Sequence, residues 1–114
     1  MKSLVCEKIA DLVFYKKMAH YYMYTLKKGF NCTDDLVKYV DRIGAIIVEL
    51  RRANMSSLSE KDKKNLMNEV DYDCRMVEQY LQDVKSGVNR LPDMESHIRK
   101  IRDAFENAEC RSAA

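Results

Sequence analysis

The second half of the chain carries a run of apolar residues at heptad spacing. They recur in steps of four and three residues, at Val70, Cys74, Val77, Leu81, Val84, Val88 and Leu91. Alternating steps of this kind average 3.5 residues and are typical of a helix that packs along another helix. The intervening residues are mostly charged or amide side chains, so the apolar stripe is narrow. A helix with one narrow stripe gains little stability alone, and we expect it to need a partner helix.

Composition indicates a single helical domain over residues 1–114. Hydrophobic residues make up 46% of the chain and charged residues 33%, with three glycines and one proline. So few turn-forming residues leave little room for a turn-rich β fold. No apolar run approaches the ~20 residues of a membrane span, and Glu7 and Lys8 interrupt the first apolar stretch, so we expect no secretory signal.

A first helix is predicted from Ser3 to Lys28. Its apolar side holds Val5, Ile9, Leu12, Ala19, Met23 and Leu26. Lys27 and Lys28 precede Gly29, and cations followed by glycine are typical of a helix C-terminus.

A second helix is predicted after Thr33, which we expect to be its N-cap. Its apolar positions again follow steps of four and three: Leu36, Val40, Ile43, Ile47 and Leu50. Gly44 lies inside this pattern. It either weakens the helix by about 1 kcal/mol relative to alanine, or allows the backbone of a neighbouring helix to approach closely.

The longest helix is predicted between Leu58 and Leu91, with Ser57 or Ser59 as its N-cap. The heptad phase changes where Val88, Leu91 and Met94 follow in two steps of three, beside Pro92. Because proline disfavours helix at the preceding residue, the chain either kinks there or starts a new helix. We therefore predict an all-α fold of three to four helices, a hairpin or bundle with a long coiled-coil-like C-terminal helix kinked or broken near Pro92. Residues 110–114 are expected to fray.

The inventory of chemically reactive motifs is sparse. His20 and His97 have no histidine or glutamate three or four residues later, as a metal-binding helix would need. Asp71 and Asp73 flank Tyr72 without a basic partner in the pattern, so a solvated face is expected. Phosphate-binding loops and nucleophile motifs are absent from the sequence. We predict a protein that is not an enzyme and has no catalytic residues, cofactor or metal.

The cysteines fall at positions 6, 32, 74 and 110, with no CxxC pair. This spacing supports neither a zinc site nor a disulfide framework, so we expect four reduced thiols in a cytoplasmic protein.

Tyrosines and lysines gather in the second half of the first helix. Tyr15, Tyr21, Tyr22 and Tyr24 lie near Lys16, Lys17, Lys27 and Lys28. Aromatic rings beside lysines bind nucleic acid or anionic lipid in some proteins, whereas tyrosine is also common at protein interfaces. The net charge of only +2 favours a protein interface, and we expect no nucleic-acid partner.

The middle of the chain contains the segments Asp35-Leu36-Val37, Val40-Asp41, Leu50-Arg51 and Ser59-Glu60, followed by heptads from Arg75 through Leu91 to Glu109. In the order and spacing of these residues the chain resembles the cappuccino subunit family of the lysosome-related-organelle biogenesis complex. Pro92 inside the last helical region departs from that family. The resemblance implies a non-enzymatic subunit of a rod-like helical complex on the cytosolic face of endosomes or lysosomes.

The predicted function is therefore that of a helical subunit in a multi-protein coiled-coil assembly, with other helical subunits as partners in a hetero-oligomer. Contact with membranes is expected only through those partners. The predicted partner-binding residues are the heptad positions of the second and third helices. Two alternatives stay open: a small helical chaperone or adaptor for a partner helix, and a Tyr/Lys-rich helix that binds anionic lipid or nucleic acid.

Overall fold

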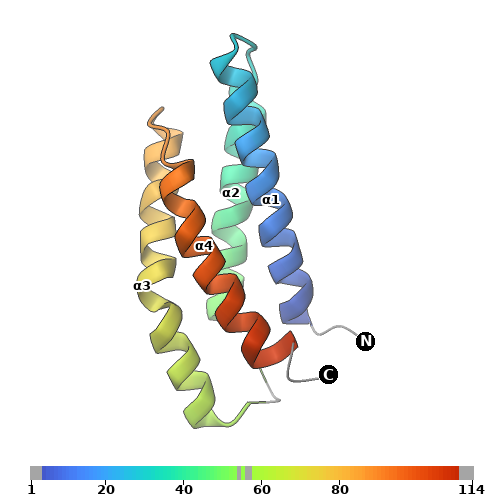
Figure 1. The fold of residues 1–114 in the computed structure, drawn as a ribbon, viewed down its shortest axis with the longest axis vertical. Helices are drawn as coiled ribbons and strands as arrows, with labels where there is room; N and C mark the ends of the chain where they lie inside the picture. The colour runs from blue at the N-terminus through green and yellow to red at the C-terminus, as the bar shows by residue number, and fades with distance from the viewer. Residues whose placement is uncertain (1–3, 54, 56–57, 111–114) are drawn as a thin grey trace.

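The protein is an all-α bundle (Figure 1). The computed structural model describes residues 4–53, 55 and 58–110. Its elements are α1 (Leu4–Lys27), α2 (Thr33–Arg51), α3 (Glu60–Lys85), α4 (Leu91–Phe105) and a π-helical turn, η1 (Glu106–Cys110). The predicted class is confirmed, and α3 is the longest helix, as expected. The last helical region is shorter than the sequence pattern suggested, because α3 and α4 are separate helices.

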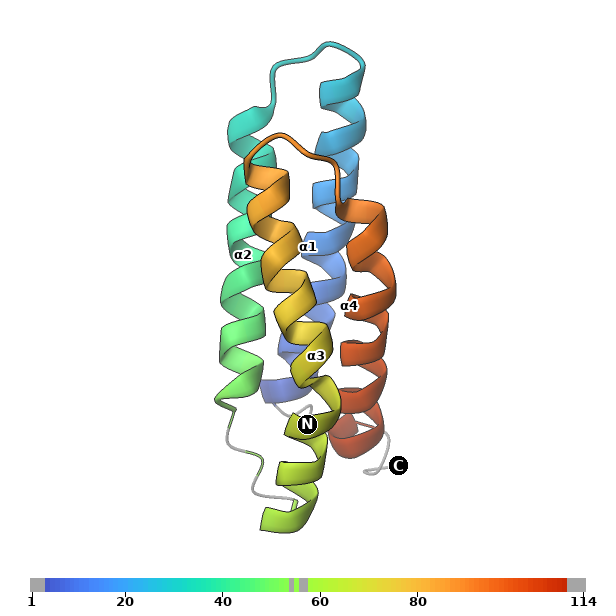
Figure 2. The same cartoon turned by 90° about the vertical axis from the view of Figure 1, so that its left-hand side faces the viewer.

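The four helices form two antiparallel hairpins, α1–α2 and α3–α4, which pack side by side (Figures 1 and 2). In Figure 2, α3 stands in front with α2 and α4 on either side and α1 behind it. The closest packing lies within each hairpin, and the contact of α1 with α4 and η1 closes the bundle. The molecule is elongated, with extents of 49 × 28 × 19 Å.

Glycine ends the first helix of each hairpin in the same way. Gly29 has φ of 99°, its N–H donates to the carbonyl of Leu26, and the next N–H donates to the carbonyl of Thr25. Gly87 has φ of 96° and takes part in the matching pair of bonds. This is the Schellman motif, in which a left-handed residue satisfies the last free carbonyls of the helix. The predicted cap at Gly29 is confirmed.

The phase change near Pro92 is a break between two helices. After the Gly87 turn the chain enters α4 at Leu91, with Pro92 in the first turn. Proline is tolerated there because the first helical N–H groups have no intrahelical acceptor. Val88 therefore lies in the turn and is 47% exposed, which contradicts its predicted place in a continuous seam.

The N-cap predictions have different outcomes. The Ser59 hydroxyl accepts a hydrogen bond of 3.1 Å from the Asp62 N–H, which confirms the cap of α3, while Ser57 lies outside the described residues. Thr33 is not the cap of α2: Cys32 holds that position, because its carbonyl already accepts from the N–H of Leu36. The Cys32 thiol donates to the carbonyl of Tyr22 and accepts no hydrogen bond from the first N–H groups of its own helix. Of the predicted tail, Cys110 ends η1 and residues 111–114 lie outside the description.

The core is built from the apolar stripes of all four helices. The α1 stripe buries Val5, Ile9, Leu12, Ala19 and Met23. The predicted α2 positions are all buried, as are the α3 positions from Val70 to Val84. α4 adds Met94, Ile98, Ile101 and Phe105. The heptad pattern thus identified the buried sides, and each stripe packs on the other helices of the same chain.

Burial of the α3 stripe predicts opposite effects of one charge at two adjacent positions. Leu81 is 4% exposed, whereas Gln82 faces solvent. Leu81→Asp should unfold the bundle, because an unpaired buried charge costs several kcal/mol, comparable with the stability of a small domain. Gln82→Asp should change the free energy of unfolding by less than about 0.5 kcal/mol. Circular dichroism during urea titration measures both, and equal stability would show that the buried side of α3 is misassigned.

Candidate interaction surfaces

The predicted partner-binding residues lie in the core of the chain itself. Leu36, Val40, Ile43, Ile47 and Leu50 on α2 are all buried, and so are Val70, Cys74, Val77, Leu81, Val84 and Leu91. Val88 alone among the predicted positions is exposed, and it lies in a turn. In this conformation the other helices of the chain occupy these surfaces. Binding of a partner by these residues stays a prediction that requires the two hairpins to separate.

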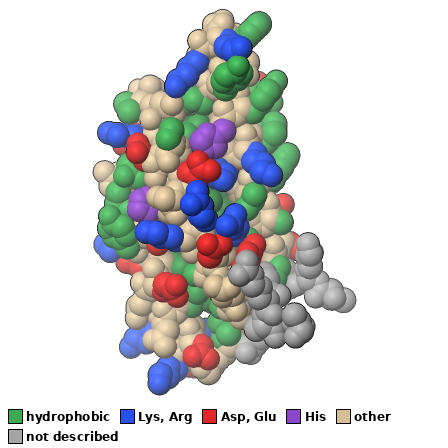
Figure 3. Space-filling view, viewed as in Figure 1, with side chains coloured by type: hydrophobic (Ala, Val, Ile, Leu, Met, Phe, Trp, Pro, Cys, Tyr) green, Lys and Arg blue, Asp and Glu red, His purple; other side chains and the backbone are tan. Residues whose placement is uncertain are grey.

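A second heptad pattern lies on the outside of α1. We call it the outer α1 stripe; its steps alternate three and four, and its residues are Glu7, Ala10, Phe14, Lys17, Tyr21, Tyr24 and Lys28. All seven are exposed, Phe14 by 44% and Tyr21 and Tyr24 by 58% each. In Figure 3, green hydrophobic side chains project along the upper right-hand edge, which α1 forms in Figure 1. The inner side of α1 is therefore apolar, whereas its outer side carries exposed aromatic residues among charged ones.

Two shallow hollows lie on the outer α1 stripe. One, of about 400 Å³, is lined by Ala10, Val13, Phe14, Lys17 and Met18. The other, of about 370 Å³, is lined by Tyr21, Tyr24, Thr25, Lys28 and Phe30. Each contains four residues spaced i, i+3, i+4 and i+7, the set that forms the hole for a side chain of a facing helix in a coiled coil. The outer surface of α1 therefore has hollows that are able to accept side chains of a partner helix.

The predicted tyrosine cluster divides between two surfaces. Tyr15 and Tyr22 are half-buried against Tyr39 of α2, with ring centroids 5.9 Å and 5.6 Å from it. The guanidinium of Arg42 lies over the rings of Tyr15 and Tyr39, which adds cation–π attraction. Tyr21 and Tyr24 remain on the outer α1 stripe. Aromatic packing thus joins α1 to α2 and leaves only the outward rings open to a partner.

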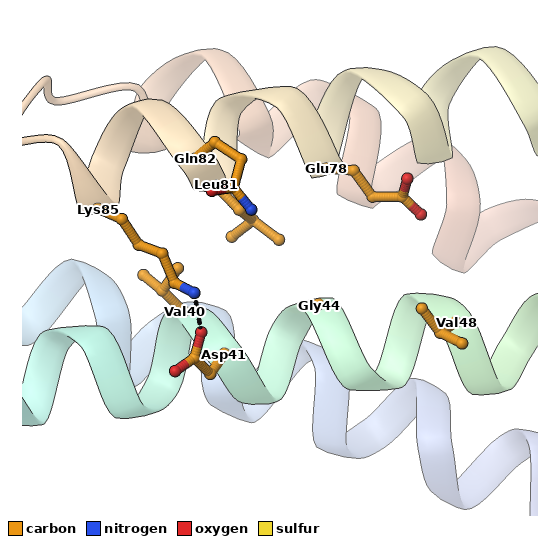
Figure 4. Close-up of a pocket in the computed structure, with 8 residues that line it drawn as sticks. All are labelled: Val40, Asp41, Gly44, Val48, Glu78, Leu81, Gln82 and Lys85. Atoms are coloured by element: carbon orange, nitrogen blue, oxygen red, sulfur yellow. Dashed lines mark ion pairs between the residues drawn. The ribbon is translucent and has the colours of Figure 1, made fainter.

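A groove of about 320 Å³ separates α2 from α3 (Figure 4). Val40 and Leu81 form its apolar wall, and Lys85 reaches across to an ion pair with Asp41 at one end. Gly44 contributes no side chain to the middle of the groove. The groove lies where the two hairpins meet, and ion pairs join the hairpins outside the core.

Gly44 does not mark an unusually close approach of two backbones. A Cβ atom added there would lie 3.6 Å from Cδ1 of Leu81, an ordinary van der Waals contact. Of the two roles that the sequence allowed for Gly44, the first therefore applies: glycine lowers the stability of α2 relative to alanine.

Gly44→Ala should stabilise the protein. Alanine fits the groove and removes the helix penalty of glycine, so the free energy of unfolding should rise by up to about 1 kcal/mol. For a chain of this size that corresponds to a rise in Tm of about 4 °C. Differential scanning calorimetry checks it, and a lower Tm would mean that the groove is tighter than it looks.

Asp73 and His97 form a partly buried pair between α3 and α4. Nδ1 of His97 lies 2.7 Å from Oδ1 of Asp73, and Asp73 is only 7% exposed. The rings of Tyr72 and Tyr80 pack at 5.8 Å and 6.0 Å from the imidazole. An aspartate–histidine pair also occurs in catalytic triads, where the histidine needs a nucleophile within hydrogen-bond reach. Among the described residues His97 has no hydrogen bond to a hydroxyl or thiol, and the pair bridges the α3–α4 hairpin.

The expectation that Asp71 and Asp73 form a solvated face is therefore wrong for Asp73, whereas the side chain of Asp71 remains 47% exposed although it is paired. Asp71 lies 2.6 Å from Arg51 and 3.1 Å from Arg75, and Glu78 lies 3.1 Å from Arg51. Burial acts to lower the pKa of Arg51, but the hydrogen bond to Asp71 and nearby negative charges raise it overall. Both aspartates meet partners from other helices, which spacing within one helix does not reveal.

His20 lies half-buried on α1, facing α4. Its Nε2 is buried and has no hydrogen-bond partner among the described residues, and burial lowers the pKa of the ring although Glu95 acts to raise it. Lys16 next to it pairs with Glu95 at 3.6 Å. Both histidines therefore lie at helix contacts, and the described residues hold no group of three or more potential metal ligands.

The cysteines differ from the expectation of four reduced thiols. Cys6 is disulfide-bonded, whereas Cys32 and Cys74 are free. The expectation rested on spacing along the chain, and spacing does not show which distant segments the fold brings together. Burial raises the pKa of the Cys74 thiol to about 11, although the charge of Arg51 acts to lower it. Cys74 is thus an inert core residue at neutral pH.

The raised pKa of Cys74 predicts a loss of stability in alkali. Above about pH 9 the thiol ionises in the unfolded chain but stays protonated in the fold, so the free energy of unfolding falls as pH rises towards about 11. The loss is at most about 3 kcal/mol. Urea titrations at several pH values compare the protein with Cys74→Ala, which should show a shallower decline over this range. Identical slopes would refute the assignment.

No known protein family, curated protein or solved structure matches this chain. Among the described residues, no helix is both long and apolar enough to span a membrane. The outer α1 stripe includes Lys17, Tyr21, Tyr24 and Lys28 of the tyrosine–lysine cluster predicted from the sequence, whereas its continuation to Glu7, Ala10 and Phe14 was not predicted. The sequence does contain a sign of this stripe, a second set of heptad positions on α1, but the inner apolar pattern is stronger.

Proposed function

We propose that this protein is a non-enzymatic helical assembly subunit that binds other helical proteins through the outside of α1. The observation that carries the proposal is the outer α1 stripe, with seven consecutive heptad positions exposed on a folded bundle. Exposed aromatic residues at heptad spacing are costly to leave in water and are typical of surfaces that bind a helix. The stripe is separate from the core, so the bundle is able to bind a partner without unfolding.

The charges on this surface favour a protein partner over lipid or nucleic acid. Lys17 and Lys28 lie on the stripe, but Glu7 lies on it as well and Asp11 is next to it. Polyanions are bound by surfaces of one sign, whereas a mixed pattern suits a partner with complementary charges. The chaperone alternative differs only in how long the partner stays bound.

The cellular site of the proposed assembly rests on the family resemblance alone. That resemblance supports a subunit of an endosomal or lysosomal trafficking complex on the cytosolic side. The disulfide bond at Cys6 argues in the other direction, because the cytosol keeps thiols reduced. Differential alkylation of Cys6 in rapidly quenched cells would decide between a reducing and an oxidising compartment.

A pair of tyrosine substitutions tests the proposed surface. Tyr21 and Tyr72 are exposed by 58% and 59%, both lie within helices, and only Tyr21 lies on the outer α1 stripe. Tyr21→Glu should remove the helical partners that co-purify with the protein from its native cells, because a charge at a contact centre resists desolvation. Tyr72→Glu should retain them. Quantitative mass spectrometry compares the two, and the same partners with both variants would reject the surface.

A further inference from the structure

The heptad positions of the outer α1 stripe read the same in both directions. From the first to the last of six positions the steps are 4, 3, 4, 3 and 4, at Ala10, Phe14, Lys17, Tyr21, Tyr24 and Lys28. A second copy of α1 laid antiparallel on the first therefore meets every position with an equivalent one. A two-fold axis level with Ala19 relates the copies, as in an isologous dimer in which each subunit offers the same surface.

The two hollows select this alignment. A side chain of an antiparallel helix enters a hole of four residues at i, i+3, i+4 and i+7. In the palindromic register Phe14 of one copy lies opposite Tyr24 of the other. It therefore enters the hole made by residues 21, 24, 25 and 28, which is the hollow of about 370 Å³. Tyr24 likewise enters the hole made by residues 10, 13, 14 and 17, which is the hollow of about 400 Å³.

Charge complementarity supports the same register. Lys28 at one end of the stripe lies opposite Ala10 of the second copy, in a hole that also includes Glu7 and Asp11 of that copy. In the described part of the chain none of these three charged side chains forms an ion pair within its own bundle. The two-fold axis repeats the arrangement, so each end of the interface places one ammonium beside two carboxylates.

Lys17 and Tyr21 are the stripe positions nearest the axis, and Lys17 of one copy lies opposite Tyr21 of the second copy. Its methylene stem is able to cover that ring while the ammonium reaches water, the usual arrangement for lysine at an apolar contact. The interface thus has aromatic contacts on either side of the axis and charged pairs at its ends.

We propose that the outer α1 stripe is the interface between two copies of this chain, packed antiparallel with Phe14 against Tyr24 and Lys28 between Glu7 and Asp11 of the second copy. The inference rests on the proposed function and names the first partner helix. The resulting dimer has a bundle on each side of the α1–α1 contact and leaves the α2–α3 groove open on both.

The oligomeric state of the purified full-length chain tests the proposal. Sedimentation velocity from about 1 μM to about 1 mM should show a monomer–dimer equilibrium for the unmodified protein. Phe14→Ala should raise the dissociation constant by about tenfold or more, since it empties two holes. Tyr72→Ala, which removes an exposed ring from α3, should leave the dissociation constant unchanged. Circular dichroism confirms that each variant is folded.

A charge exchange tests the register without removing an aromatic side chain. Lys28→Glu places a third carboxylate beside Glu7 and Asp11 of the second copy and should raise the dissociation constant about tenfold or more. Adding Glu7→Lys and Asp11→Lys to that variant inverts both sides and should restore dimerisation. Failure of the triple variant to recover, while it stays folded, would overturn the register.

Two results separate this inference from the proposed function. If the protein is a monomer at every concentration, the proposed dimer is wrong. The proposed function would still stand if Tyr21→Glu removes the helical partners that co-purify from cells. A dimer that withstands both Phe14→Ala and Lys28→Glu also overturns the inference, because it would use another face. A dimer that responds as described, without any co-purifying helical partner, would support the inference and contradict a hetero-assembly.

Discussion

The fold depends on the apolar stripes of α1, α2, α3 and α4 burying one another, because each stripe is too narrow to stabilise its helix alone. Each is a heptad line of apolar side chains, and a helix of this kind is marginal in water without a neighbour. The chain supplies the neighbours itself, because it reverses at Gly29 and Gly87 within a few residues. Left-handed backbone at those two residues satisfies the helix ends and sets each following helix beside its predecessor.

The sequence predicted which side of each helix is buried better than it predicted which residues of the other helices contact that side. Periodicity placed Val77 and Leu81 correctly in the core, because burial of a stripe depends only on spacing within one helix. It placed Val88 wrongly in the core, because the heptad spacing continues through residues 86–90 although the helical backbone ends at Lys85. Arg51 of α2 and His97 of α4, which pair with Asp71 and Asp73, could not be predicted for the same reason: a period within one helix contains no information about another helix. Arg75, the other partner of Asp71, lies four residues later on α3 itself.

The outer α1 stripe shows a different limit of sequence reasoning. The heptad spacing of both stripes is present in α1, but one apolar stripe is enough to account for a helix, so spacing alone does not single out the outer one. Only the fold shows that Phe14 and Tyr21 are exposed while Leu12 is fully buried, and that the Phe14 ring also stacks on Tyr39 of α2. The candidate surface therefore follows from geometry, and the partner-binding role expected for the inner stripes belongs to residues that the chain already uses for its own core.

The contact of α1 with η1 joins the two ends of the described chain. During synthesis from the N-terminus, the α1–α2 hairpin is complete long before η1 leaves the ribosome. Its contacts are local and helical, so it is able to form within microseconds to milliseconds. Translation at about 5–20 residues per second leaves its inner side without α3, α4 and η1 for several seconds. The nascent chain therefore displays apolar surface on both sides of α1, and in that interval it is most exposed to chaperones, proteases and premature pairing with a neighbouring chain.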